Sequence, residues 1–466
     1  MTAEIAILNK SAVALAADSA VTISAGTKEE KIFFSADKLF ELSHNNPIGI
    51  MIYNGMQFMQ APLQMLISEY RLKCRKVDRV EQAAEEFLGF LTDWGASSPV
   101  PVQARAIDAI VLPLIKMMND ALLRHFQDLL QAGSSETMAE KLPAAVTRVI
   151  EIFEAVYAEQ AQASFFGGAP KPRTEHINYV RALAKGFGPT KDDEELERVV
   201  QICMQALLKK PLSEGRTGIV IAGFGSLDMF PSLASYEIDG MVFGSLKYEK
   251  TNFVDIDRDG DRARVLPFAQ KEMVERFLYG IDSDIEDSIA EWVSRTIPPI
   301  KDEMLNSLQM SDEDMAELRN KAVLAENAVV EELRKSGFAE IRSQSRSAID
   351  AMVEFMPKPE LATMAEALVN LTSIKRRVSR GMETVGGPID VALISKSEGF
   401  VWVKRKHYFS ADLNPRYGAR VVHQVQEAQG GQHAADHVAR ETRPEGRTAP
   451  KKRRGRKASG EHEKGD

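Results

Sequence analysis

The first 55 residues alternate between short apolar runs and turn residues, a pattern typical of β-strands. The runs are AEIAIL and SAVALAAD, which the turn dipeptide Asn9-Lys10 separates, followed by DKLFEL and PIGIMIYNG. Short apolar or alternating runs between turn residues predict strands, and the first two predict a β-hairpin. The next stretch, MQFMQAPLQMLISEYRLKCRK, changes to helical spacing, with one apolar face made of Phe58, Leu63, Leu66, Ile67 and Tyr70.

Helical and strand patterns then follow each other in long blocks. Residues 76–210 read as helices, the first of which begins with Asp78 and Glu81 in capping-box spacing. Strand signals return from Gly218 to about residue 261, a second helical block covers about 270–380, and IDVALISK and FVWVKRKHYF predict a closing hairpin. Because strands come first, in the middle and last, we expect one sheet domain with helical insertions.

The composition is that of a soluble globular protein, with 44% hydrophobic and 27% charged residues. No apolar run approaches the roughly 20 residues that span a bilayer, and the N-terminus does not read as a signal peptide. The two cysteines, Cys74 and Cys203, supply neither a disulfide framework nor metal-ligand spacing. We therefore expect a cytoplasmic protein without membrane contacts.

The charge is uneven along the chain. The net charge is −8, yet residues 424–466 hold ten Lys/Arg and seven Asp/Glu, including the run PKKRRGRK. This tail has too few branched aliphatic residues to bury a core, so we expect it to be disordered. Its basic run has two interpretations, a solvated terminus or a contact with nucleic acid or an acidic partner. Outside this tail, the acidic body predicts no nucleic-acid binding.

Thr2 becomes the N-terminal residue if Met1 is removed. A threonine hydroxyl is a weak nucleophile that needs a base, and its own α-amine, with a pKa of about 7.7–8.0, is able to accept the proton. Such a nucleophile has to begin a strand, since a loose terminus does not hold a reactive geometry. A nearby lysine would keep the amine neutral, and an aspartate would position that lysine. Asp18 and Lys38 are the candidates for these roles.

This arrangement resembles the proteasome β-subunit and HslV-type threonine peptidases, which are N-terminal nucleophile hydrolases. Asp18 lies in an AADS motif sixteen residues after Thr2, the family's own separation, and DKLFEL supplies Lys38 in place of the family's KVIEI-like strand. In the family, a backbone N–H at the end of the next apolar strand forms the oxyanion hole. The corresponding residues here are Asn54 and Gly55.

The resemblance covers residues 1–73, 216–282 and 371–411, with helical insertions at 74–215 and 283–370. The sequence departs from the family pattern in three places. Phe268-Ala269 replaces a Ser-Gly pair, and Val385 replaces a supporting serine. The family's aspartate falls near Met382, where the neighbouring Glu383 is the possible auxiliary carboxylate. The triad of Thr2, Asp18 and Lys38 is complete.

The resemblance implies an α+β fold, a four-layer αββα sandwich enlarged by the two insertions. It implies a hydrolase that cleaves amide bonds, those of peptides above all, through an ester on Thr2, and that works as a homo-oligomer. No cofactor is implied, and nothing in the sequence specifies a partner ATPase. Two alternatives stay open, an inactive proteasome-like scaffold subunit and an amidase acting on small molecules.

The acidic stretch DIDRDGD resembles the start of a calcium-binding loop. Asp255, Asp257, Asp259 and Gly260 match its first ligand positions, but Leu266 stands where a bidentate glutamate is needed. Strand patterns flank the stretch, so an acidic hairpin turn is the better interpretation. The histidines show no metal-binding spacing, and we expect no metal site.

Overall fold

The computed structural model describes residues 2–24, 30–131, 138–210, 212–213, 215–308, 311–379, 385–410, 413–414 and 416. Residues 1–408 form one compact unit and 409–466 a second one. Most of the second unit, including the basic tail 424–466, lies outside the described residues. The elements below belong to the first unit.

Two antiparallel sheets form the centre of the molecule. The five-stranded sheet has the order β13 (Ala263–Ala269), β1 (Ala3–Asn9), β2 (Val13–Ala17), β14 (Asp390–Ser395) and β15 (Gly399–Lys404). The six-stranded sheet has the order β5 (Leu39–Ser43), β6 (Ile48–Asn54), β10 (Thr217–Gly223), β11 (Ser232–Val242), β12 (Ser245–Asp255) and β9 (Ser164–Phe166). The first, middle and last strand segments of the chain thus share sheets, and the mixed α+β class is confirmed.

The helices and minor strands connect these sheets. Two short hairpins pair β3 with β4 and β7 with β8. Their bounds are Val21–Ser24, Glu30–Phe33, Gln57–Phe58 and Ala61–Pro62. The helices before β10 are α1 (Leu63–Lys73), α2 (Val80–Ala96), α3 (Val100–Gln131), α4 (Met138–Glu159), α5 (Thr174–Phe187) and α6 (Asp193–Leu208). Those after β13 are α7 (Glu272–Tyr279), α8 (Ser283–Asn306), α9 (Asp312–Glu332), the π-helix η1 (Leu333–Gly337), α10 (Phe338–Glu354) and α11 (Lys358–Val378).

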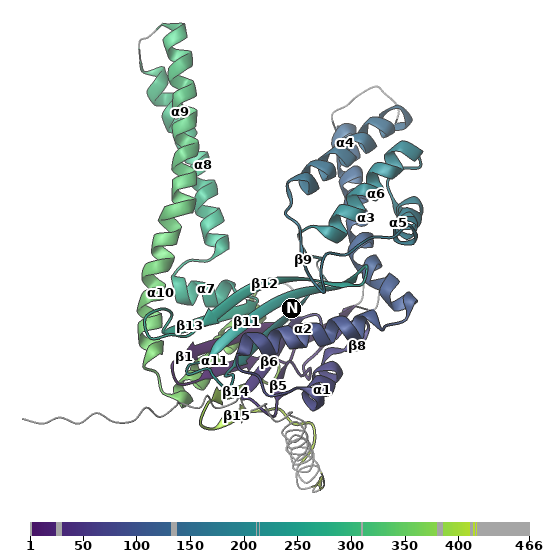
Figure 1. Ribbon diagram of the computed structural model, residues 1–466. Helices are drawn as coiled ribbons and strands as arrows, with labels where there is room; N and C mark the ends of the chain where they lie inside the picture. The colour runs from purple at the N-terminus through teal and green to yellow at the C-terminus, as the bar shows by residue number, and fades with distance from the viewer. Residues whose placement is uncertain are drawn as a thin grey trace, which may run out of the picture. The chain divides into compact units, whose positions relative to one another are not determined.

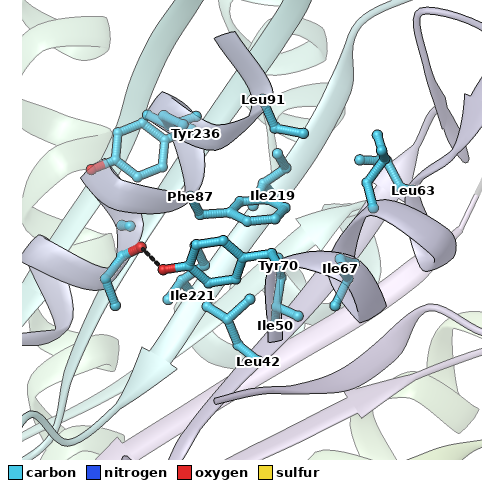
Figure 2. Packing of buried hydrophobic residues seen from close by; sticks show 14 of the residues in the cluster. Leu42, Ile50, Leu63, Ile67, Tyr70, Phe87, Leu91, Ile219, Ile221 and Tyr236 are labelled. Atoms are coloured by element: carbon cyan, nitrogen blue, oxygen red, sulfur yellow. Dashed lines mark hydrogen bonds between the residues drawn. The ribbon is translucent and has the colours of Figure 1, made fainter. Parts of the chain in front are cut away.

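Three apolar clusters stack these elements in layers. One joins the facing sides of the two sheets, with Leu15 and Ala392 from one sheet and Met51 and Val220 from the other. A second lies between the five-stranded sheet and α7, α10 and α11. The third lies between the six-stranded sheet and α1 and α2 (Figure 1). Figure 2 shows this third cluster, where the rings of Tyr70 and Phe87 meet edge to face with centroids 5.2 Å apart.

The segments predicted as insertions contribute to these layers. Helix α2 packs against β10, β11 and β12, whereas α3, α4, α5 and α6 pack mainly among themselves around a fourth apolar cluster. Helices α10 and α11 contact β1, and α8 pairs with α9. The predicted boundaries at 74–215 and 283–370 stay predictions.

The capping box predicted at Asp78 and Glu81 is wrong. Helix α2 begins at Val80, and its N-cap residue is Arg79, whose side chain makes no cap bond. The Val80 N–H instead donates to the Asp228 carboxylate, at 3.2 Å. A side chain from a distant loop therefore satisfies the helix terminus, which the local spacing did not reveal.

The acidic stretch from Asp255 to Asp261 is not a hairpin turn. It follows β12, which belongs to the six-stranded sheet, and it precedes β13, which pairs with β1 in the other sheet. The stretch therefore carries the chain from one sheet to the other. Among the residues that the structure describes, no group of three His, Cys, Asp or Glu side chains is arranged to hold a metal ion.

Candidate active site

Thr2 lies directly before β1, the strand between β13 and β2 in the five-stranded sheet. Its carbonyl accepts a hydrogen bond from the Gln270 N–H, 3.2 Å away at the end of β13. Its side chain is buried, and its hydroxyl has no hydrogen-bond partner among the described residues. A buried hydroxyl without a partner is rare in folded proteins and is free to engage a ligand.

Asp18 holds the start of β1 in place. It follows β2, and its backbone N–H donates to the Ala3 carbonyl at 3.2 Å. One carboxylate oxygen, Oδ1, accepts the Ala3 N–H at 3.2 Å. The other, Oδ2, accepts the N–H groups of Ala20 at 3.3 Å and Gly386 at 2.9 Å. The residue that follows the predicted nucleophile is thereby tied to a buried carboxylate.

Lys38 brings a cation to the same carboxylate. Its Nζ lies 2.5 Å from Asp18 Oδ1, and both side chains are fully buried. Lys38 precedes β5, and its carbonyl accepts the Ile52 N–H of β6 at 2.9 Å. The ion pair therefore connects the two sheets. Because both charges have lost their hydration, the attraction between them offsets this cost only when the geometry of the pair is good and further hydrogen bonds are made.

The loop before β14 closes over Asp18. Besides the bond from its N–H to the carboxylate, Gly386 accepts the Ser19 N–H at 3.2 Å, and the Ser19 hydroxyl donates to the Pro388 carbonyl at 2.5 Å. Gly386 has a φ of 156°, which favours glycine. The possible auxiliary Glu383 and its neighbour Met382 lie outside the described residues.

The predicted oxyanion residues end β6. Asn54 is exposed and has a φ of 61°, the left-handed conformation that asparagine tolerates. A Cβ atom on Gly55 would lie 2.0 Å from the Thr217 hydroxyl oxygen, so the close approach of β10 requires glycine. The Ile52 N–H donates to the Lys38 carbonyl, and Asn54 lies two residues after Ile52 on β6. Its role as an oxyanion donor stays a prediction.

Glu4 is a site residue that the sequence analysis missed. Its side chain is fully buried, and within the described residues neither carboxyl oxygen has a hydrogen-bond partner. Burial raises the pKa of the Glu4 carboxyl well above its ordinary value; the Lys38 cation lowers it in part, and the Asp18 carboxylate raises it further. The signal in the sequence is one acidic residue within the apolar run AEIAIL.

Aromatic rings line the surroundings of Glu4. Phe268 lies directly opposite Glu4 in the pairing of β1 with β13, and the ring of Tyr53 lies 5.7 Å from that of Phe268. The Tyr53 hydroxyl donates to Glu237 at 3.2 Å. Burial, followed by the charge of Glu237, raises the pKa of Tyr53. The Tyr53 hydroxyl therefore stays neutral, and it donates to Glu237 and not to Glu4.

Both cysteines are free and buried, and in the part of the chain that the structure describes, no helix combines the length and apolar content that crossing a bilayer requires. The cytoplasmic location stays a prediction.

Comparisons with known proteins found similar chains among solved structures. No family model and no curated protein matches it. Among solved structures, it is similar to Anbu, an ancestral β-subunit, from Yersinia bercovieri, with 10% identity, a TM-score of 0.24, and coverage of 95% of this chain and 98% of that one. It is also similar to a mutant of Anbu from Hyphomicrobium sp. strain MC1, with 9% identity, a TM-score of 0.23, and coverage of 96% and 99%. TM-scores this low establish no common fold, so the site is interpreted from its own geometry.

Proposed function

We propose that the chain is an N-terminal threonine hydrolase that cleaves amide bonds, those of peptides above all. The observation that carries this proposal is the Asp18 carboxylate, which binds both the N–H of the residue after Thr2 and the ammonium group of Lys38. The two antiparallel sheets and the helices packed on them support the proposal, since the resemblance to N-terminal nucleophile hydrolases implies an α+β sandwich.

The proposed reaction begins once Met1 is removed. The Thr2 hydroxyl attacks the substrate carbonyl and passes its proton to the α-amine, while an N–H near Asn54 and Gly55 binds the oxyanion. The leaving amine departs, an ester remains on Thr2, and water hydrolyses it. The Lys38 cation disfavours a second positive charge on the α-amine, which keeps that amine available as a base. Asp18 orients Lys38.

Intact mass after treatment with a β-lactone tests this proposal. We expect the purified chain to lack Met1 and to gain one acyl group on Thr2. The Thr2→Ala variant should gain none and should hydrolyse no amide, yet remain folded, because the hydroxyl bonds none of the residues that the structure describes. Retention of Met1 together with peptide hydrolysis would contradict the mechanism. A processed chain that stays unmodified would favour the scaffold alternative.

A pair of lysine variants sharpens the test. Lys38→Ala should lower kcat/KM by at least about 100-fold, the range expected when proton transfer fails. Lys31→Ala, on the exposed side of β4, removes the same charge outside the site and should leave kcat/KM unchanged. Equal activities of the two variants would exclude Lys38 from catalysis.

We also propose that the chain self-associates through its helices. The support is a set of large apolar side chains that α8 exposes, namely Trp292, Ile300 and Met304. Light scattering should give an oligomeric mass for both the full chain and a truncation at residue 423. A monomeric mass for both would contradict the proposal.

A further inference from the structure

Glu4 and Thr2 lie on the same face of the first strand. Along β1, Ala3, Ile5 and Ile7 belong to the cluster on the helix side of the sheet. Ala6 and Leu8 belong to the cluster between the two sheets. Because side chains alternate along a strand, Thr2 and Glu4 point with Ala6 and Leu8 into the space between the sheets.

The charged groups that act on Glu4 in this space are the Asp18 carboxylate and the Lys38 ammonium group. The Lys38 ammonium group is paired with Asp18, whose carboxylate also accepts three backbone N–H groups. Glu4 has no such support from the residues that the structure describes, because none of them bonds either of its oxygens. An isolated ionised carboxylate is very costly to bury, so the surroundings of Glu4 favour its protonated form. The raised pKa described above has the same cause.

A buried acid that holds a proton close to a nucleophile is suited to proton transfer. Residues two apart on a strand have Cα atoms roughly 6.5–7 Å apart, a gap that a glutamate side chain bridges directly or through one water molecule. Catalytic hydrogen bonds are often formed only in the substrate complex. The Glu4 oxygens and the Thr2 hydroxyl, which have no partner among the described residues, are therefore available for such bonds.

We propose that Glu4 is the general acid of this site, which protonates the leaving nitrogen of the amide and afterwards takes a proton from the hydrolytic water. This proposal rests on the function proposed above, and it assigns the two proton transfers to two different groups. The α-amine of Thr2 exchanges a proton with its own hydroxyl, and Glu4 exchanges one with the leaving group and with water.

The protons balance over one cycle. In acylation, the Thr2 Oγ–carbon bond forms and the Oγ proton moves to the α-amine. The carbon–nitrogen bond breaks, and the leaving nitrogen takes the Glu4 proton. Glu4 therefore ends acylation as a carboxylate, and the α-amine of Thr2 ends it as an ammonium group. In deacylation, water attacks the ester and gives a proton to Glu4, while the ammonium group returns its proton to the departing Oγ. Both groups regain their starting states.

The dependence on the leaving group distinguishes this role from a structural one. An amide nitrogen has to be protonated to leave, whereas the nitrophenolate of an activated ester leaves without an acid. In the Glu4→Gln variant, we expect kcat for a peptide amide to fall by at least about 100-fold. The acylation burst with a p-nitrophenyl ester should stay within a few-fold of the unmodified chain, followed by slow turnover. Glu41→Gln, a strand carboxylate paired with His44, is the matched control.

Thr2 acylation by a β-lactone and the melting temperature complete the experiment. Glu4→Gln and Glu4→Leu should both be acylated and should melt no lower than the unmodified chain, because each replaces a buried acid without a partner. Undiminished amide hydrolysis in Glu4→Gln, or equal losses of the amide rate and of the ester burst, would overturn the assignment. Failure of the unmodified chain to be acylated would instead refute the proposed function itself.

Discussion

Replacing Asp18 by asparagine should destabilise the protein, because the side-chain NH₂ group would face another hydrogen-bond donor in either orientation of the amide. In the native site, Oδ1 accepts from Ala3 and Lys38, and Oδ2 accepts from Ala20 and Gly386. An asparagine has one acceptor oxygen and one NH₂ group. Its NH₂ group must therefore face either the Lys38 side or the Gly386 side, where every neighbouring group is a donor.

The expected cost follows from these contacts. Removing one partner of a buried ion pair destabilises a protein by about 3–5 kcal/mol, since the other charge stays buried. We expect Asp18→Asn to cost about this much. Lys38→Met keeps the side-chain volume and leaves the Asp18 carboxylate with its three N–H donors, so its cost should be that of one charged hydrogen bond, about 1.5–3 kcal/mol.

Urea denaturation followed by circular dichroism measures both free energies of unfolding. Lys31→Met is the control, and as an exposed substitution it should stay within about 0.5 kcal/mol of the unmodified chain. The double variant Asp18→Asn/Lys38→Met should cost less than the sum of the single variants, because no unpaired ammonium group remains. A Lys38→Met cost equal to or above that of Asp18→Asn would refute this account of the site.

Three further predictions concern single positions. Gly55→Ala should destabilise by about 1–3 kcal/mol through its clash with Thr217, and adding Thr217→Ala should recover part of this loss in the same urea assay. Asp228→Ala should cost about 1–2 kcal/mol because α2 loses its cap, and an unchanged urea midpoint would contradict this. Glu4→Gln should gain stability over the unmodified chain as pH rises above about 4.3, since the unfolded chain releases the Glu4 proton there while the folded chain keeps it. Melting curves from pH 4 to 8 would show this, and a constant difference would exclude it.

The strands near Thr2 were predictable because their signals are local. The apolar runs on either side of Asn9 form β1 and β2, and Asn9 itself accepts the N–H groups of Ser11 and Ala12 at the turn. The meeting of Asp18 and Lys38 was predictable only from their order along the chain and the resemblance, since no local rule brings residues 20 positions apart together.

What escaped prediction depends on contacts between distant segments. Asp228 caps α2 from 148 positions away, so the nearby spacing of Asp78 and Glu81 was misleading. The stretch after β12 was assigned to a hairpin because both flanks have strand character, but its two strands belong to different sheets. Glu4 was overlooked as one polar residue in a strand, since its missing partners become visible only once both sheets are assembled.

The bond from Gly386 to Asp18 joins residues 368 positions apart, and this fixes when the site is completed during synthesis. At about 5–20 residues per second, a ribosome needs roughly 20–70 s to extend the chain from one residue to the other. Until then, β2 lacks its neighbour β14 and the Asp18 carboxylate lacks one of its donors. In the proposed enzyme, Thr2 is therefore made long before the surroundings that would activate it. This delay would keep the proposed nucleophile from acting on neighbouring chains until Gly386 has been added.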